Sequence, residues 1–447
     1  MKPIQSSVGN PLSGVVAPPG DKSISHRAFL IGALAVGTSK ITGVLEAQDV
    51  LATINSIQAL GARVKRSDGN IWHVSGRGLG ALCEPKGVID LENSGTAARL
   101  LLGILATHDI RAVLTGDKSL CNRPMKRVIT PLLMMGADIE YKENFRLPVI
   151  TRGTAEPLPL KYELPIASAQ VKSAIILAGL NAPGCSSVVE PYPTRDHTEN
   201  LLRHFGANIS VTELSGNRRC VTIQGQPELS ANDISVPGDI SSASFLLVAA
   251  LIVPGSRVEC KHVGINPLRT GLIKVLKRMG AAIEIRNKRS VAGEIIADIK
   301  AEASSLKGIT VKCEEAPSMI DEYPILAIAA AFAEGKTRME GLSELRVKES
   351  DRLAAMKNGL ERCGVETETG KDWLVVHGVG GAGKRPKGGK IVPVEFDHRI
   401  AMSFLVMGMM TERPVTIDDG SFISTSFPQF CSMMLSLGAN IVERSQS

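Results

Sequence analysis

Apolar helical stretches along the chain are followed by segments in which apolar and polar residues alternate. One junction recurs six times: a helical stretch stops at glycine, a small residue follows, and an alternating strand-like segment begins. Glycine favours the left-handed conformation that ends a helix, so each copy predicts a helix, a stop and a strand. Successive copies lie 75, 70, 74, 84 and 74 residues apart. The six glycines are Gly61, Gly136, Gly206, Gly280, Gly364 and Gly438.

A second pattern runs in phase with the first. Apolar helices rich in small residues begin at intervals of 72, 74, 73, 80 and 76 residues. Most begin with Ser or Asp, which are favoured N-terminal caps. The two patterns together predict six units of roughly 75 residues, each with two helices and several strands, and hence an α/β fold. These helices begin near Lys22, Ser94, Ser168, Ser241, Asp321 and Asp397.

The two halves of the chain also match each other. PGDKSISHRAFLIGALAVG, from Pro19, aligns without gaps with PGDISSASFLLVAALIVPG, from Pro237. The match indicates two similar domains of three units each, related by duplication. We expect the first domain to span 20–238 and the second to combine 1–19 with 239–447.

The matched segments differ in charge. Ser23 aligns with Ser241, which suggests that a serine cap is part of the shared architecture. In contrast, Lys22 aligns with Ile240, and Arg27 with Phe245. We expect the two cations to serve a ligand of the first half.

Charged side chains occur at the starts of many predicted helices. A helix N-terminus presents free N–H groups and a partial positive charge, so it favours anions. A cation there is locally unfavourable, which points to a function. If the six units pack alike, two cationic faces would close into an interdomain cleft that binds phosphates and carboxylates. Asp321 and Glu349 are the carboxylates expected near such a cleft, where either could act as a base.

Composition narrows the class of protein. Hydrophobic residues make up 44% of the 447 residues and aromatic residues only 4%, which predicts an aliphatic core. A net charge of +6 with few aromatics argues against a nucleic-acid-binding stripe. The eight cysteines show no zinc-binding spacing and indicate reduced thiols in the cytoplasm. No signal peptide and no membrane span is predicted.

One segment imitates a phosphate-binding loop. GVGGAGK, residues 378–384, matches the glycine and lysine spacing, but Arg385 stands where Ser or Thr is required. We interpret it as a flexible basic hairpin.

Eight motifs, in order along nearly the whole chain, resemble the 5-enolpyruvylshikimate-3-phosphate (EPSP) synthase family. Each motif alone would be weak, but together they are specific. They are PGDKSISHRA (19–28), NSGTAARLL (93–101), RPM (123–125), SAQVKSA (168–174), RDHTE (195–199), DEYP (321–324), KESDR (348–352) and DHRIAM (397–402).

The resemblance implies two domains, each of three βαβαββ units, with the active site in the cleft between them. It also implies that phosphoenolpyruvate gives its enolpyruvyl group to the 5-hydroxyl of shikimate 3-phosphate, releasing phosphate. This reaction belongs to chorismate and aromatic amino acid biosynthesis. No metal or organic cofactor is expected, and the enzyme is expected to be a monomer.

The resemblance also assigns residues. Asp321, Glu349, Lys22 and Lys348 would be catalytic, with Asp321 accepting the 5-hydroxyl proton and Glu349 handling the proton on the methylene carbon. Shikimate 3-phosphate would be bound by Lys22, Ser23, Arg27, Ser168, Ala169, Gln170, Arg195, Asp321 and Lys348. Phosphoenolpyruvate would be bound by Lys22, Gly95, Arg123, Gln170, Arg352 and Arg399.

Three alternatives remain at this point. The nearest is a sugar-nucleotide enolpyruvyl transferase of cell-wall synthesis, which shares the fold but not the Lys22-Ser23 pair with Arg27 or the KESDR run. The others are an RNA-binding protein built from similar units and an inactive binding homologue. His26 and His398 are expected either to brace their neighbours or to contact ligand.

Overall fold

The computed structural model describes residues 2–381 and 384–444, which form two compact units. The first unit contains residues 20–237 and 290–294. The second contains the described residues of 1–19, 238–289 and 295–447. The boundaries at 19/20 and 237/238 lie in the two PGD segments, whereas nothing in the sequence pointed to the short piece 290–294. Two residues of the P-loop-like segment, 382 and 383, lie outside the described part.

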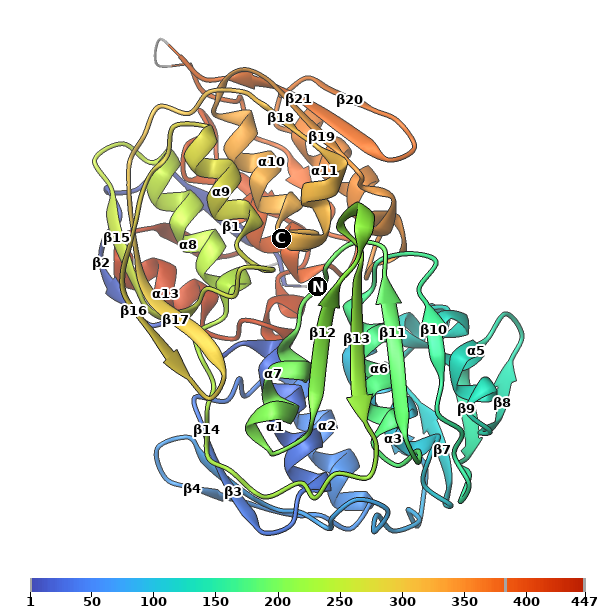
Figure 1. The fold of residues 1–447 in the computed structure, drawn as a ribbon. Helices are drawn as coiled ribbons and strands as arrows, with labels where there is room; N and C mark the ends of the chain where they lie inside the picture. Colours follow the sequence, from blue (N-terminus) through green and yellow to red (C-terminus); the bar gives the residue numbers. More distant parts are fainter. Residues whose placement is uncertain (1, 382–383, 445–447) are drawn as a thin grey trace. The chain divides into compact units, whose positions relative to one another are not determined.

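The first unit is built from three sheets around a shared aliphatic core (Figure 1). Its helices are α1 (Lys22–Leu34), α2 (Gln48–Ala59), α3 (Gly95–Leu105), α4 (Lys118–Asn122), α5 (Lys126–Met134), α6 (Ala169–Gly179) and α7 (His197–His204). Its strands are β3 (Thr38–Thr42), β4 (Arg63–Ser67), β5 (Ile71–Ser75), β6 (Ile89–Asp90), β7 (Arg111–Thr115), β8 (Asp138–Lys142), β9 (Arg146–Arg152), β10 (Lys161–Glu163), β11 (Cys185–Glu190), β12 (Ile209–Glu213), β13 (Arg219–Gln224) and β14 (Ile234–Ser235).

The second unit repeats this plan with its own core. Its helices are α8 (Ile240–Ile252), α9 (Gly271–Arg278), α10 (Tyr323–Ala331), α11 (Arg352–Arg362), α12 (His398–Gly408) and α13 (Phe430–Leu437). Its strands are β1 (Ile4–Ser7), β2 (Ser13–Val16), β15 (Arg257–Gly264), β16 (Ala282–Val291), β17 (Glu294–Glu302), β18 (Thr310–Val311), β19 (Glu334–Glu340), β20 (Thr367–Thr369), β21 (Trp373–Val379), β22 (Ile391–Val392), β23 (Val415–Ile417) and β24 (Asn440–Glu443).

The described strands form six sheets of four strands each. In the sheet β6-β7-β9-β8, for example, β6 runs parallel to β7, and β9 pairs antiparallel with both β7 and β8. With the short α4 before α5, this segment reads β6-α3-β7-α4-α5-β8-β9. The prediction of an α/β fold made of repeated βαβαββ units is therefore confirmed.

The first residues of the chain complete sheets of the second unit. Strand β1 lies between β23 and β24, antiparallel to both, and β2 runs parallel to β15. In the first unit, the edge position beside β3 is filled by β14, from the end of that half. Each unit therefore closes its set of three sheets with a strand distant in sequence.

The recurring glycines have the conformation that the sequence predicted. Each follows the end of a helix and has a positive φ. Residues with a Cβ rarely adopt this conformation, so glycine is needed for the chain to leave the helix and enter the next strand. The φ values at Gly61, Gly136, Gly206, Gly280, Gly364 and Gly438 are 95°, 98°, 99°, 97°, 82° and 110°.

The central helices of each unit pack directly on one another. Helix α3 lies against α6 in the first unit, and α10 contacts both α8 and α12 in the second. The approach of α3 to α6 depends on Gly103, since a Cβ there would lie 2.3 Å from the carbonyl oxygen of Ala174 and 2.7 Å from its Cα. Backbone on the opposite side cannot move aside as a flexible side chain can.

We expect Gly103→Ala to lower the free energy of unfolding by about 2 kcal/mol or more, because overpacking outweighs the roughly 1 kcal/mol that alanine gains in helix propensity. Denaturant titration measures the change. Gly87→Ala is the matched control, since nothing lies within 4 Å of its added Cβ; its effect should stay within about 0.5 kcal/mol. A stabilised Gly103→Ala variant would contradict this account of the α3–α6 contact.

Candidate active site

The starts of the three central helices meet in the first unit. Gln170, in the first turn of α6, donates its side-chain amide to Thr96 Oγ1 of α3 at 3.0 Å and accepts from Arg99 Nη1 at 2.8 Å. Arg27 of α1 donates to Ser173 Oγ of α6 at 3.0 Å. The hydrogen bonds thus bring together three helix starts that are about 75 residues apart in sequence.

Lys22 and Arg27 occupy the first turns of α1 in different ways. Lys22 is partly exposed, and its Nζ lies 2.9 Å from Asp49 Oδ2 at the start of α2. Arg27 is only 3% exposed. Its Nε donates to Thr198 Oγ1 at 2.7 Å and its Nη1 to the carbonyl of Ser23 at 2.9 Å. Burial lowers the pKa of the Arg27 guanidinium to about 10, against the opposing effect of Glu199.

The prediction that a serine caps α1 is wrong. Asp21 holds the cap position, and its side chain accepts from Ile24 N at 2.9 Å. In the matched helix α8, Asp239 accepts from Ser241 N at 2.7 Å. The aspartate of each PGD segment therefore caps its helix, and Ser23, in the first turn, remains half-buried beside Lys22.

Arg123 is held at the start of α3. Its Nη2 donates to Asn93 Oδ1 at 2.5 Å, and Asn93 in turn donates to Asp117 Oδ2 at 2.6 Å. A Cβ added to Gly95 would lie 3.0 Å from Arg123 Nη1 and 2.9 Å from Arg99 Nη1. The absence of a side chain at Gly95 therefore leaves room for two guanidinium groups at this helix start.

The remaining predicted residues of the first unit lie at the starts of α6 and α7. Ser168 caps α6 by accepting from Val171 N at 3.5 Å. Ser168, Ala169 and Gln170 are all half-buried, and so is Arg195, which lies two residues before α7. The first unit therefore gathers every predicted residue of the first half around its helix starts.

Arg352 is the centre of a second cluster, in the second unit. Its side chain is 1% exposed and touches three carboxylates: Asp397 at 2.7 Å, Asp321 at 3.2 Å and Glu349 at 2.6 Å. Burial works against the guanidinium charge, but the three carboxylates, Asp397 foremost, outweigh it and raise the pKa of Arg352 above its ordinary value. The arginine is therefore a fixed positive charge.

Asp321 lies at the edge of this cluster, where solvent still reaches it. Its side chain is 14% exposed, and Lys348 Nζ approaches Oδ1 to 3.5 Å. Asp321 is not the cap that its position suggested, because α10 begins at Tyr323 and the cap position belongs to Glu322, which makes no side-chain cap bond. Its carboxylate is turned instead towards Lys348 and Arg352.

Arg399 completes the second cluster. Its Nη1 donates to the carbonyl of Asp321 at 3.0 Å and lies 3.5 Å from Glu322 Oε1. Glu322 is buried and also accepts from Ser241 Oγ of α8. The starts of α8, α10 and α12 therefore meet as those of α1, α3 and α6 do, but carboxylates surround the cations here.

The two histidines lie in different surroundings. His26 is fully buried, and its Nδ1 lies 2.6 Å from Thr53 Oγ1 of α2. Burial and the nearby Lys22 and Arg27 hold its pKa well below 6.5, so it is neutral. His398 Nδ1 lies 3.5 Å from Thr425 Oγ1. His26 therefore braces α1 against α2.

Sequence reasoning did not single out the partners that hold the site. They are brought in by the fold from neighbouring segments, and no spacing rule links them to the cations they contact. Asn93, Arg99, Glu322 and Asp397 lay within recognised motifs, whereas Asp49 and Asp117 did not. The partners are Asp49, Asn93, Arg99, Asp117, Glu322 and Asp397.

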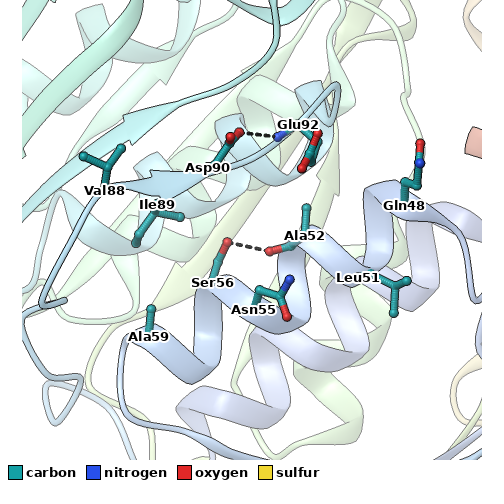
Figure 2. Close-up of a pocket in the computed structure, with 10 residues that line it drawn as sticks. All are labelled: Gln48, Leu51, Ala52, Asn55, Ser56, Ala59, Val88, Ile89, Asp90 and Glu92. Carbon is teal, nitrogen blue, oxygen red and sulfur yellow. Dashed lines mark hydrogen bonds between the residues drawn. The ribbon is translucent and has the colours of Figure 1, made fainter.

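A surface pocket of about 370 Å³ lies elsewhere in the first unit, between α2 and the segment around β6 (Figure 2). Its lining mixes apolar side chains such as Leu51 and Val88 with Asp90 and Glu92. It contains none of the predicted site residues. In the described part of the chain, no group of three or more His, Cys, Asp or Glu could hold a metal ion. No helix there has the length and apolar character needed to cross a membrane.

Comparison with known proteins identifies the family of the chain. The model of the family EPSP synthase (3-phosphoshikimate 1-carboxyvinyltransferase) matches residues 7–434. A 3-phosphoshikimate 1-carboxyvinyltransferase of Paramagnetospirillum magneticum is 56% identical over 440 residues, covering 98% of both chains. The corresponding protein of Granulibacter bethesdensis is 58% identical over 423 residues, covering 94% of this chain and 92% of the relative.

Solved structures extend the comparison. EPSP synthase of Acinetobacter baumannii matches with a TM-score of 0.88 at 42% identity, covering all of both chains. The enolpyruvyl transferase NikO of Streptomyces tendae matches with a TM-score of 0.79 over all of both chains, but at 17% identity it shows the fold alone. The family model, the full-length relatives and the motifs at the helix starts agree: the chain belongs to the EPSP synthase family.

Proposed function

We propose that the chain transfers the enolpyruvyl group of phosphoenolpyruvate to the 5-hydroxyl of shikimate 3-phosphate and releases phosphate, as a step in chorismate and aromatic amino acid biosynthesis. One observation carries the proposal. In a chain of this family, the charged side chains of the motifs gather at the helix starts of each unit, as a reaction between two phosphorylated carboxylic acids requires.

The first cluster supplies most of the proposed contacts to shikimate 3-phosphate. Lys22 and Arg195 would provide charge, and the half-buried Ser23, Ser168, Ala169 and Gln170 would provide polar groups at helix starts. Arg27 has three of its guanidinium nitrogens engaged within the unit, so it would contribute its charge from a fixed position. From the second cluster, Asp321 and Lys348 would contact the same substrate.

Phosphoenolpyruvate would be held by cations of both clusters. Arg123 and Lys22, with Gly95 and Gln170, are the proposed contacts in the first unit. Arg352 and Arg399 are those in the second. Arginine binds carboxylate and phosphate groups in a bidentate way, which suits a substrate that carries one of each.

The proposed chemistry has two stages. The 5-hydroxyl loses its proton to Asp321 as its oxygen attacks C2 of phosphoenolpyruvate, while the methylene carbon gains a proton. The resulting tetrahedral intermediate then loses phosphate as a proton leaves its methyl group, which restores the double bond. Glu349 handles the proton on this carbon, with Lys22 and Lys348 as point charges or proton donors. The 5-hydroxyl oxygen loses its proton as it forms the bond to C2, and the methyl carbon loses its proton as the double bond forms again.

The surroundings of Asp321 support its proposed role as the base. Its carboxylate is accessible, and Lys348 at 3.5 Å and Arg352 at 3.2 Å fix its position. Glu349 Oε2 is held 2.6 Å from Arg352 Nη2, so the same guanidinium orients both carboxylates. The expectations of a monomer and of a cytoplasmic location remain predictions.

An assay of phosphate release tests the function. Purified chain should release phosphate from phosphoenolpyruvate only when shikimate 3-phosphate is present, and UDP-N-acetylglucosamine should not replace it. Turnover with the sugar nucleotide alone would assign the chain to the cell-wall branch that shares its fold. RNA binding without any phosphate release would favour the nucleic-acid alternative.

We expect Asp321→Asn to lower kcat by about 10²-fold or more, because the amide cannot accept the hydroxyl proton. Binding of shikimate 3-phosphate, measured by calorimetry, should change by only a few-fold, since the shape of the side chain is kept. Asp372→Asn is the matched control: it makes the same chemical change at an exposed position of the second unit. Near-normal turnover in Asp321→Asn would remove Asp321 from the mechanism.

A further inference from the structure

A buried group of three charges in the first unit has no part in the proposed chemistry. Lys172 of α6 is 1% exposed, and its Nζ lies 3.0 Å from Glu190 Oε2 and 2.8 Å from Glu199 Oε1. Glu190 ends β11 and Glu199 lies in the first turn of α7; their side chains are 0% and 1% exposed. Burial opposes the Lys172 charge, but the two carboxylates outweigh it and raise its pKa. Lys172 is thus held as a cation between the two carboxyl groups.

The group fixes the backbone directly before Arg195. Glu190 accepts from Thr194 N at 2.9 Å and from Thr194 Oγ1 at 2.7 Å. Lys172 Nζ donates to the carbonyl oxygen of Thr194 at 3.1 Å. The amide nitrogen, the hydroxyl and the carbonyl oxygen of Thr194 therefore all form hydrogen bonds with this group. The next residue in the chain is Arg195.

The neighbouring residues of the same two helices hold Arg27. Ser173 follows Lys172 and Thr198 precedes Glu199, and their hydroxyl oxygens lie 2.7 Å apart. Arg27 donates to both, at 3.0 Å and 2.7 Å. Because the two carboxylates exceed Lys172 by one charge, the group also leaves a net negative charge beside this buried guanidinium. Glu199 is the strongest of the charges that favour the protonated form of Arg27.

The fold itself does not require a charge at this position. Lys172 is the fourth residue after the cap of α6. In the other five central helices within the described chain, the fourth residue after the cap position is also buried, and none is charged. These residues are Ser25, Ala98, Ala243, Leu326 and Ala401.

A buried ion group is costly to desolvate, and apolar replacements are often neutral or stabilising. Its presence in one helix of six therefore points to a role other than stability. We infer that Lys172, Glu190 and Glu199 are positioning residues that hold Arg195 and Arg27 in place for shikimate 3-phosphate. This inference rests on the proposed function, and it concerns binding of that substrate and not the proton transfers.

Two variants test the inference. Lys172→Met removes the charge at similar length, and Glu199→Gln keeps the side-chain shape and an oxygen that can still accept from Lys172. We expect each to raise the KM and the calorimetric Kd for shikimate 3-phosphate by about tenfold or more, since a small misplacement of binding groups has a large effect. The KM for phosphoenolpyruvate and kcat at saturation should stay within about threefold of the parent.

Ile176→Val provides the control for a merely structural effect. Ile176 is buried in the same helix, 1% exposed, and makes no polar contact, so the variant should lower the melting temperature without changing the KM for shikimate 3-phosphate. Variants whose KM for shikimate 3-phosphate stays within twofold of the parent, even if their melting temperature falls as in this control, would overturn the inference. If Lys172→Met does not fold, the KM for shikimate 3-phosphate of Glu199→Gln tests the inference by the same criteria.

Measurements on the parent chain distinguish failure of the proposed function from failure of the positioning role. Absence of phosphate release that depends on shikimate 3-phosphate in the parent would refute the proposed function. An active parent together with Lys172→Met and Glu199→Gln variants of normal KM would refute the positioning role alone.

Discussion

The interaction on which the site depends is the pairing of cations with carboxylates at the starts of the central helices. A helix start carries a partial positive charge, and a lysine or arginine placed there is unfavourable by itself. In this chain Lys22 meets Asp49 from another segment. Arg352 meets Asp397 and Asp321 from other segments and Glu349 three residues before it. These contacts stabilise positive charge at the helix starts, where a phosphorylated substrate would bind.

The two units stabilise the cations at their helix starts in different ways. In the first, Arg27 and Arg123 are held mainly by hydrogen bonds to neutral groups, such as Thr198, Ser173 and Asn93. In the second, carboxylates surround the arginine, which leaves an accessible acid beside a fixed cation. One unit thus suits anion binding and the other proton transfer, although both descend from the same repeated plan.

Much of the fold follows from the sequence because its signals are local. A glycine at the end of a helix and a cap at its start are short-range features, and their recurrence at a near-constant interval revealed the repeated units. The positive φ at Gly61 and its five counterparts has the same cause in each copy. The predictions from the sequence were wrong where two residues close in sequence could both cap a helix: Asp21 and not Ser23 caps α1, and Glu322 and not Asp321 holds the cap position of α10. The partners of the charged residues were not predictable, because contacts such as Lys172 with Glu190 or Arg352 with Asp397 join segments that only the packed sheets and helices bring together.

The proposed function requires that the helix starts of the first unit bind the phosphorylated substrate. The most direct measurement is a crystal structure of the chain with shikimate 3-phosphate. The account predicts that the substrate's phosphate and carboxylate contact Lys22, Ser23, Ser168, Gln170 and Arg195, with Arg27 close by. Substrate bound in the pocket between α2 and β6, or elsewhere with these residues untouched, would contradict it.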